Sequence, residues 1–350
     1  MGTEFHDTMR SLDCHNQLLG DTSALDRALK HDGYLFLRGV VDTTMIAQAR
    51  QVVEAWFRSQ SVLTTDHRVV PDGPDRVERL GLHPPGLSDT QIWQWIALHP
   101  TMRQLYVQLF GGPGYVLPIG EYQFTWPGKA DCWSRIHQDA PFSVNLDYVT
   151  FWVPLVPIDA RLGGLALIPG PHDAKSFHPT LDDGTIAPFI PPKSFNSEDW
   201  HRADLLPGDL LLFGVWTPHC GLPNDTDRLR LSVDFRVQPP GMQRPIIGVV
   251  VEVDEGSISI ATEGSGVRTI TLDGLTVLRQ RTYGGPEPVD PRGYLGQRVV
   301  AVAEHGRAIV IRYPRDYVPG IQVGEPQAGV LQPGIQSQVS DLALPPVVNQ

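Results

Sequence analysis

The stretch over about residues 115–238 constrains the fold more than any other part of the chain. It consists of short runs rich in Val, Tyr, Phe, Trp and Ile, which turn residues separate without an intervening long helix. Many short strands joined by Pro- and Gly-containing turns indicate an all-β sandwich or barrel. Before this stretch, apolar residues recur at helical spacing in residues 23–31, 42–57 and 91–110. We therefore predict a mainly β core with helices flanking it on the N-terminal side.

A second β pattern follows the Pro239-Pro240-Gly241 link. Its alternating segments are residues 249–254, 257–262, 267–272, 299–303 and 308–313. About five short strands in so short a region indicate a small β-barrel-like domain. We predict a main domain over residues 1–240, a β-rich accessory domain over 241–320 and an extended tail over 321–350. The hypothesis for the accessory domain is a role in stability or in assembly of a homo-oligomer.

Two further segments are predicted to be surface loops near the mouth of a binding site. Residues 61–88 are rich in Pro, Gly, Asp and Arg, and residues 176–204 are polar and rich in proline. Long segments of this composition in compact domains are often lids or binding loops.

Composition excludes several classes of partner. The chain has 28 basic and 39 acidic residues and a net charge of −11, which argues against a nucleic-acid partner. No run approaches the ~20 apolar residues of a membrane span, and the first residues lack a signal-sequence pattern, so a cytoplasmic protein without a membrane partner is expected. Cys14, Cys132 and Cys220 are far apart and lack CxxC spacing, which argues against a zinc ribbon or a disulfide framework.

The triplet His137-Gln138-Asp139 is the strongest candidate for a metal site. On an extended strand, His137 and Asp139 point to the same side, so an imidazole and a carboxylate can bind one ion together. His219, which follows the Pro207-Gly208-Asp209 turn and an apolar run, is the candidate third ligand. Two His and one carboxylate with open positions opposite them suit non-heme Fe(II) that reacts with O2.

Arg228 and Arg230 are candidates for binding a co-substrate. Both lie on the extended run that follows His219. A guanidinium is permanently charged and forked, so it can hold a small dicarboxylate by two parallel hydrogen bonds beside the metal. The spacing alone leaves both arginines open as the clamp.

The ordered motifs resemble those of the phytanoyl-CoA dioxygenase family, whose members use Fe(II) and 2-oxoglutarate. The matching pieces are the Asp32 to Gly39 segment, His137-Gln138-Asp139, the Gly163 to His172 segment, Leu206-Pro207-Gly208-Asp209, His219 and Arg230-Leu231-Ser232. The resemblance implies a double-stranded β-helix, a jelly-roll or cupin-like pair of sheets. It also implies His137, Asp139 and His219 as iron ligands. Because the family places its arginine in an Arg-x-Ser context, the resemblance favours Arg230 over Arg228 as the clamp, with Ser232 beside it.

Three more residues are weaker candidates for the 2-oxoglutarate site. Thr150 and Trp152 lie on one predicted strand and are expected to wall the co-substrate or bond to it. Gln123, on an earlier strand, is expected to reach its C1 carboxylate. Packing of the sheet explains all three equally well. Because related halogenases replace the carboxylate ligand with a small residue, the presence of Asp139 favours hydroxylation over halogenation.

The leading hypothesis is an Fe(II)- and 2-oxoglutarate-dependent dioxygenase that uses O2 to hydroxylate an unactivated C–H of a small molecule and releases succinate and CO2. Desaturation, cyclisation and epimerisation are the alternatives on the same metal site. A zinc hydrolase with the same ligands has no use for Arg230, and a non-catalytic jelly-roll binding protein does not require an intact ligand set. Neither the substrate nor the oligomeric state follows from the sequence.

Overall fold

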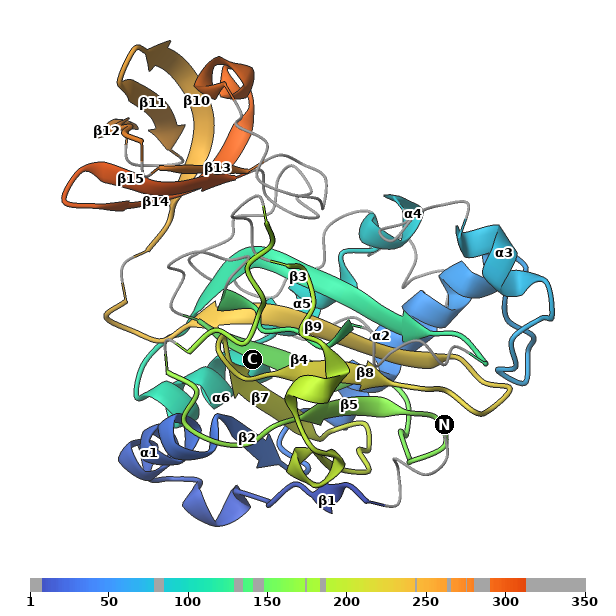
Figure 1. Cartoon of the computed structure of the whole chain (residues 1–350). Helices are drawn as coiled ribbons and strands as arrows, with labels where there is room; N and C mark the ends of the chain where they lie inside the picture. Colours follow the sequence, from blue (N-terminus) through green and yellow to red (C-terminus); the bar gives the residue numbers. More distant parts are fainter. Residues whose placement is uncertain are drawn as a thin grey trace.

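The computed structural model describes residues 8–78, 85–128, 135–140, 148–173, 175–182, 187–242, 244–262, 266–274, 276–279 and 290–312. Within these residues the protein is mainly β, and helices precede the core strands, as predicted (Figure 1). The predicted tail over 321–350 lies outside the described residues. None of the described helices combines the length and apolarity that a membrane crossing demands.

The four longer helices are α1 (Thr22–Asp32), α2 (Thr43–Ser59), α5 (Ile92–Leu98) and α6 (Pro100–Phe110). Three of them, α1, α2 and α6, begin at a residue whose side chain caps the first turn. The side chain of Asp21 caps α1 by accepting from the Ala24 amide at 2.9 Å, and Gly33 ends the helix in the left-handed conformation. Asp42 caps α2 by accepting from two amides of its first turn. Pro100 separates α5 from α6 because proline is tolerated in a first helical turn but not in a helix interior.

The two segments predicted to be loops contain regular structure. Residues 61–88 hold two short helices, α3 (Gly73–Glu78) and α4 (Pro85–Ser88). Residues 176–204 hold two 3₁₀ turns, Pro192–Ser194 and Ser197–Asp199, and the strand β6 (His201–Arg202). The prediction of a strandless loop was wrong at β6, because this strand is held by main-chain pairing with two neighbours that lie far away in the sequence.

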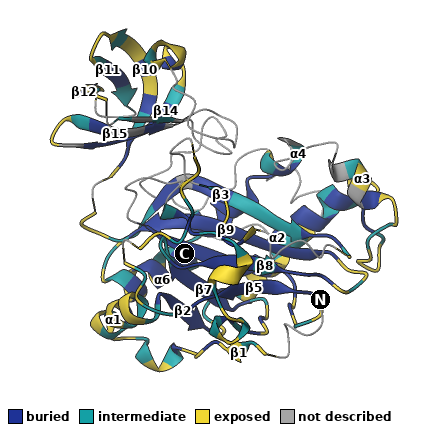
Figure 2. Cartoon of the chain, viewed as in Figure 1, coloured by how far each residue is buried: buried dark blue, intermediate teal, exposed yellow. Residues whose placement is uncertain are grey.

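Two sheets form the core of the main domain. One has five strands in the order β2 (Tyr34–Leu37), β7 (Leu210–Gly214), β4 (Val149–Pro154), β9 (Arg230–Gln238) and β3 (Tyr115–Thr125). The other has four strands in the order β1 (Arg10–Ser11), β6, β5 (Gly164–Leu167) and β8 (His219–Leu222). In this five-stranded sheet β2, β7, β4 and β9 are almost completely buried, whereas much of the edge strand β3 is half-buried (Figure 2).

The strand β9, which lies between β4 and β3, has two contrasting faces. Leu231, Val233, Phe235 and Val237 belong to the large apolar core that also contains the buried residues of α2, α5 and α6. The alternate residues are all polar and all buried, and they are Arg230, Ser232, Asp234, Arg236 and Gln238. Because successive side chains on a strand point to opposite faces, one face of the sheet packs on the helices and the other is polar. Gly120 on β3 belongs to the packed face, where Trp93 lies so close that a Cβ would collide with its ring.

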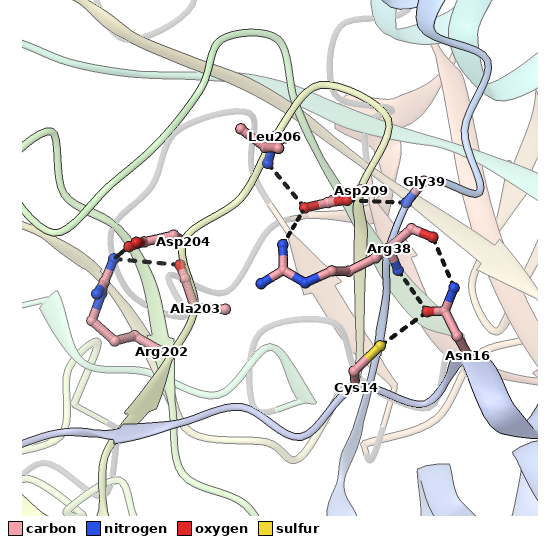
Figure 3. A network of polar contacts seen from close by, with 9 residues as sticks. All are labelled: Cys14, Asn16, Arg38, Gly39, Arg202, Ala203, Asp204, Leu206 and Asp209. Atoms are coloured by element: carbon pink, nitrogen blue, oxygen red, sulfur yellow. Dashed lines mark hydrogen bonds and ion pairs between the residues drawn. The ribbon is translucent and has the colours of Figure 1, made fainter.

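The Pro207-Gly208-Asp209 turn joins the start of β7 to the end of β2. Asp209 accepts hydrogen bonds from the Gly39 amide at 3.0 Å, the Arg38 guanidinium at 3.0 Å and the Leu206 amide at 2.9 Å (Figure 3). Asp209 is buried and therefore needs these partners. This part of the family pattern thus has a structural function, since it fixes the edge of the sheet.

The C-terminal region forms a small closed barrel. Its strands are β10 (Ile246–Asp254), β11 (Ser257–Thr262), β12 (Gly266–Thr271), β14 (Arg298–Glu304), β15 (Arg307–Arg312) and the appended β13 (Val277–Arg279). Consecutive pairings run from β12 through β11, β10 and β14 to β15, and a β12–β15 pairing closes the ring. The predicted β-barrel is therefore confirmed for this region.

The barrel contacts the main domain through a small apolar cluster. Val302 on β14 is buried together with Leu117 and Ile119 of β3 and with Tyr148, which immediately precedes β4. The Arg244 guanidinium lies over the Tyr115 ring at 5.0 Å from its centroid. Figure 1 shows the barrel beyond the β3 side of the five-stranded sheet.

Candidate metal centre

His137 and His219 are brought together by main-chain hydrogen bonds. The His137 amide donates to the His219 carbonyl at 3.0 Å, and the His219 amide donates to the His137 carbonyl at 2.9 Å. This antiparallel bridge joins the HxD triplet to the first residue of β8. The two imidazole centroids lie 4.3 Å apart as a result. The structure therefore places His219 beside the HxD triplet, and its role as the third ligand stays a prediction.

The hydrogen bonds of the two imidazoles leave the same nitrogen free on each ring. Nδ1 of His137 lies 2.9 Å from the Arg135 carbonyl, and Nδ1 of His219 lies 3.0 Å from the Thr217 carbonyl. A carbonyl oxygen only accepts, so each Nδ1 carries the proton and each Nε2 keeps a lone pair. Metal-ligating histidines are oriented by bonds of this kind.

Asp139 completes the set with one of its two carboxylate oxygens. Oδ1 lies 3.8 Å from Nε2 of His137, whereas Oδ2 accepts a hydrogen bond of 3.0 Å from the Thr150 hydroxyl. The Arg236 guanidinium lies 3.6 Å from the same Oδ2. Burial alone would raise the pKa of Asp139, but Arg236, the two histidines and the Thr150 hydrogen bond lower it to about 2. Asp139 is therefore ionised near neutral pH.

The three side chains fit a divalent metal ion. One ligand atom from each of His137, Asp139 and His219 lies within 4.8 Å of the others, and these three form the metal-binding group found in the described part of the chain. The pKa of His219 is lowered to about 3, mainly by burial and also by the neighbouring His137, so this imidazole is neutral. Metal binding requires neutral imidazoles and an ionised carboxylate. Two imidazoles and one carboxylate suit Fe(II), among other transition metals.

The middle residue of the triplet anchors the site, a function that the sequence analysis missed. Gln138 is fully buried, and its side-chain amide donates to the carbonyls of Lys175 and Trp216 at 2.9 and 2.5 Å. Its main-chain amide donates to Nε2 of His178 at 3.0 Å. His178 is thus held by main-chain groups, since its Nδ1 also lies 2.8 Å from the Ala187 carbonyl, and it is not part of the ligand group.

Arg230 is buried between the two sheets, whereas Arg228 is exposed. The Arg230 Nη1 donates to the Gly164 carbonyl of β5 at 2.9 Å, and its guanidinium lies 5.9 Å from the Trp152 ring centroid. Arg230 thus reaches from the five-stranded sheet to the sheet that carries His219. A buried cation on this face attracts an anionic ligand more strongly than a solvated cation does, because water screens the solvated charge.

The other predicted co-substrate residues share the polar face of this sheet. Trp152 and Thr150 lie opposite Asp234 and Arg236 in the β4–β9 pairing, and Gln123 lies opposite Ser232 in the β3–β9 pairing. Ser232 donates to the Gln123 carbonyl at 3.4 Å. Thr150 bonds to the metal ligand Asp139, a partner that the sequence did not predict. The Gln123 amide nitrogen is directed at two carboxylates, those of Asp234 at 2.9 Å and Glu121 at 3.2 Å.

Sequence reasoning missed the charged pair Arg236 and Asp234. Arg236 pairs with Asp234 and also approaches Asp139. Burial raises the pKa of Asp234, and the neighbouring Arg236 guanidinium lowers it. The signal was present in the strict alternation of β9, where every second residue from Arg230 to Gln238 is polar. Alternation of polar and apolar residues is also typical of a strand with one face in solvent, so the pattern alone does not place these charges in the site.

Comparison with known proteins identifies the class as an oxygenase. The family model described as phytanoyl-CoA dioxygenase matches residues 29–232, which is more than half of the chain. The chain belongs to the phytanoyl-CoA dioxygenase family. The sequence-based prediction of a non-heme iron, 2-oxoglutarate-dependent enzyme is thereby confirmed.

Two curated relatives are 1-deoxypentalenic acid 11-beta-hydroxylases. That of Streptomyces arenae is 29% identical over 250 residues, which cover 66% of this chain and 86% of the relative. That of Streptomyces exfoliatus is 27% identical over 252 residues, which cover 67% and 86%. Among solved structures, the epimerase SnoN in complex with Fe3+, alpha ketoglutarate and nogalamycin RO is 22% identical, with 62% of this chain and 84% of SnoN covered and a TM-score of 0.42. A score this low carries no argument about the present chain.

Proposed function

We propose that the protein hydroxylates an unactivated C–H of a small molecule, with consumption of 2-oxoglutarate and O2 and release of succinate and CO2. The observation that carries the proposal is the convergence of two Nε2 lone pairs and one carboxylate oxygen from His137, His219 and Asp139. These ligands would hold Fe(II) on a core that we interpret as a double-stranded β-helix, given its two sheets with the ligands between them.

The bound Fe(II) would supply the positions and electrons for O2, coupled to decarboxylation of 2-oxoglutarate. The chain's own residues prepare these positions. The two carbonyls behind the imidazoles hold each Nδ1 proton in place, so that both rings present Nε2. The bridge between His137 and His219 fixes the separation of the rings before any metal binds. The free-energy cost of rearranging these side chains when a metal binds is therefore small.

Arg230 is the residue that we propose to bind the far carboxylate of 2-oxoglutarate. It is buried, permanently charged and on the same strand face as Ser232, which would add a hydroxyl to the carboxylate's surroundings. The Trp152 ring lies beside the guanidinium and would form one wall of the pocket for 2-oxoglutarate. Contacts of Thr150 and Gln123 with 2-oxoglutarate remain predictions, since both side chains have carboxylate partners in this structure.

Hydroxylation is favoured over the other oxidations by two observations. Two curated relatives, each covered over 86% of its length, are named 1-deoxypentalenic acid 11-beta-hydroxylases, and this name gives an organic acid as their substrate. Asp139 occupies the ligand position that would have to be vacant for a halide. A hydrolase with zinc at the same ligands would leave the buried Arg230 without a purpose.

The test is substrate-independent in its first stage. Purified protein with Fe(II), ascorbate and 2-oxoglutarate should form succinate slowly under air, and His219→Ala should not. In the second stage, small organic acids are screened for a substrate that accelerates succinate formation and gains one oxygen atom by mass spectrometry. Succinate formation at the same rate in His219→Ala would contradict the metal assignment. A product that has lost two hydrogens instead of gaining oxygen would replace hydroxylation by desaturation.

A further inference from the structure

A chain of buried polar contacts leads away from the metal ligand Asp139. Arg236 lies 3.6 Å from Oδ2 of Asp139 and forms an ion pair with Asp234. Asp234 in turn accepts from the Gln123 amide at 2.9 Å, and the same amide nitrogen donates to Glu121. Asp139, Asp234 and Arg236 are each less than a tenth exposed. The functions proposed above for the iron ligands and for Arg230 do not require this series of polar contacts.

The two oxygens of Asp139 have different surroundings. Oδ1 faces Nε2 of His137 at 3.8 Å, which places this oxygen on the side of the imidazoles. Oδ2 accepts from Thr150 and faces Arg236. A carboxylate that is free to rotate can offer a metal either oxygen or both. The hydrogen bond and the cation on Oδ2 remove this freedom and leave Oδ1 for the metal.

Arg236 is itself held in position from the opposite side. A buried guanidinium is costly unless it is paired and hydrogen-bonded, and Asp234 on the same strand face supplies the pairing charge. The Gln123 amide then orients the second oxygen of Asp234. Arg236 thus lies between two carboxylates, one of which fixes it while it acts on the other.

We propose that Arg236 is a positioning residue for the metal site. Its guanidinium holds Oδ2 of Asp139 away from the metal, so that Asp139 binds through Oδ1 alone and the neighbouring coordination positions stay open for the co-substrate and O2. Asp234 holds Arg236 in place and has no direct part in metal binding. The inference rests on the proposed function, because it assumes that the His137, Asp139 and His219 group binds a divalent metal.

The first measurement compares the binding of Mn(II) to the wild-type protein and to Arg236→Met by calorimetry. Methionine keeps much of the volume of the side chain and removes the charge. Changes in groups that orient metal ligands typically cost about tenfold to a hundredfold in metal affinity, and we expect a loss in this range. Arg268→Met is the matched control, because Arg268 is exposed on β12 of the barrel and should leave the affinity unchanged.

A second variant separates positioning from folding. Arg236→Met leaves Asp234 buried without its cation, which destabilises the fold and could by itself loosen the metal site. The double variant Arg236→Met with Asp234→Asn removes the unpaired charge. We expect its thermal midpoint to return toward that of the wild-type protein, while Mn(II) binding stays weakened because Oδ2 of Asp139 still lacks its guanidinium. Recovery of Mn(II) affinity together with stability would show that Arg236 serves only the fold.

The outcomes distinguish this inference from the proposed function. If wild-type protein binds Mn(II) no better than His219→Ala, the metal assignment itself fails. If wild-type protein binds Mn(II) and Arg236→Met binds it equally well, the metal site stands and the positioning role of Arg236 is overturned.

Discussion

The molecule contains two β interiors of opposite character. Between the sheets of the main domain, the residues of β9 and its neighbours bury charged side chains, among them Asp139, Asp234, Arg230 and Arg236. The interior of the C-terminal barrel is built mainly from Ile, Val and Ala, with Tyr294 as its one aromatic ring among the described residues. Tyr294 donates its hydroxyl proton to the Ile311 carbonyl at 3.1 Å, so its own polar group is paired.

The two interiors differ in the free-energy cost of burying their side chains. Burying a charge is unfavourable unless it is paired and hydrogen-bonded, and a well-packed apolar interior of the same volume is often more stable. The described hydrophobic core of the barrel contains no charged side chain and so avoids this cost. The main domain instead keeps an apolar face on β9 for stability and a charged face for binding. The buried charges between the sheets therefore surround the site where we propose that the chemistry takes place.

The largest expected effect is that of removing a metal ligand. His137→Ala, Asp139→Ala and His219→Ala should each abolish iron-dependent succinate formation, because each removes one of three protein bonds to the metal. Circular dichroism should show an unchanged fold, since the main-chain bridge between His137 and His219 does not depend on the side chains. Full activity in any one of the three would break the assignment of the charged interior to metal binding.

The next effect concerns the two arginines. Arg230→Ala should raise the KM for 2-oxoglutarate, since losing a hydrogen bond to a charged group in a pocket costs ~1.5–3 kcal/mol, or about tenfold to a hundredfold. Arg228→Ala is the control and should change KM little, because Arg228 is exposed. If Arg228→Ala had the greater effect, the clamp would lie outside the buried face.

A substitution in the barrel should affect stability and leave chemistry unchanged. Ile260 is fully buried in the barrel core, and Ile260→Ala should lower the free energy of unfolding of this region by about 2–5 kcal/mol. Val267→Ala on the neighbouring strand is the control, because Val267 is exposed. Chemical denaturation measures the effect, and Mn(II) calorimetry should give the wild-type affinity for both variants. A weakened metal site in Ile260→Ala would show that the two interiors are coupled.

The smallest effect is expected at the contact between the two regions. Val302→Ala removes buried apolar surface against Leu117, Ile119 and Tyr148 and should cost about 1–2 kcal/mol of stability. If the barrel has only an accessory role, the KM for 2-oxoglutarate and the rate of succinate formation should not change. A change in either without loss of fold would make the barrel part of the active site.

The sequence predicted that His137, Asp139 and His219 form one group, and the structure brings them together. The information for this group is local or carried by ordered motifs, and its role in metal binding stays a prediction. The HxD spacing places two ligands on one side of the chain, and the family pattern identifies His219 and Arg230. The cap of the first helix does not follow from the sequence in this way. Asp21 and Ser23 are both good capping residues two positions apart, and in the structure the Asp21 side chain caps the helix.

The parts that were not predicted depend on contacts between distant residues. The strand β6 exists because β1 and β5 pair with it, and the barrel closes through a parallel β12–β15 pairing. The Arg236 contacts were also beyond sequence reasoning. Alternation places Arg236 and Asp234 on one face, but it does not show that Asp139, almost a hundred residues earlier, packs against them.

The most direct test of the charged interior is an anaerobic titration of the wild-type protein with Fe(II) followed by 2-oxoglutarate. A weak charge-transfer band should appear in the visible spectrum and saturate at one equivalent, because the metal and the co-substrate would then share one site. The band should be absent in Asp139→Ala and should require much more 2-oxoglutarate in Arg230→Ala. If no band forms in wild-type protein that binds Fe(II), the bound metal serves a reaction other than 2-oxoglutarate-dependent oxidation.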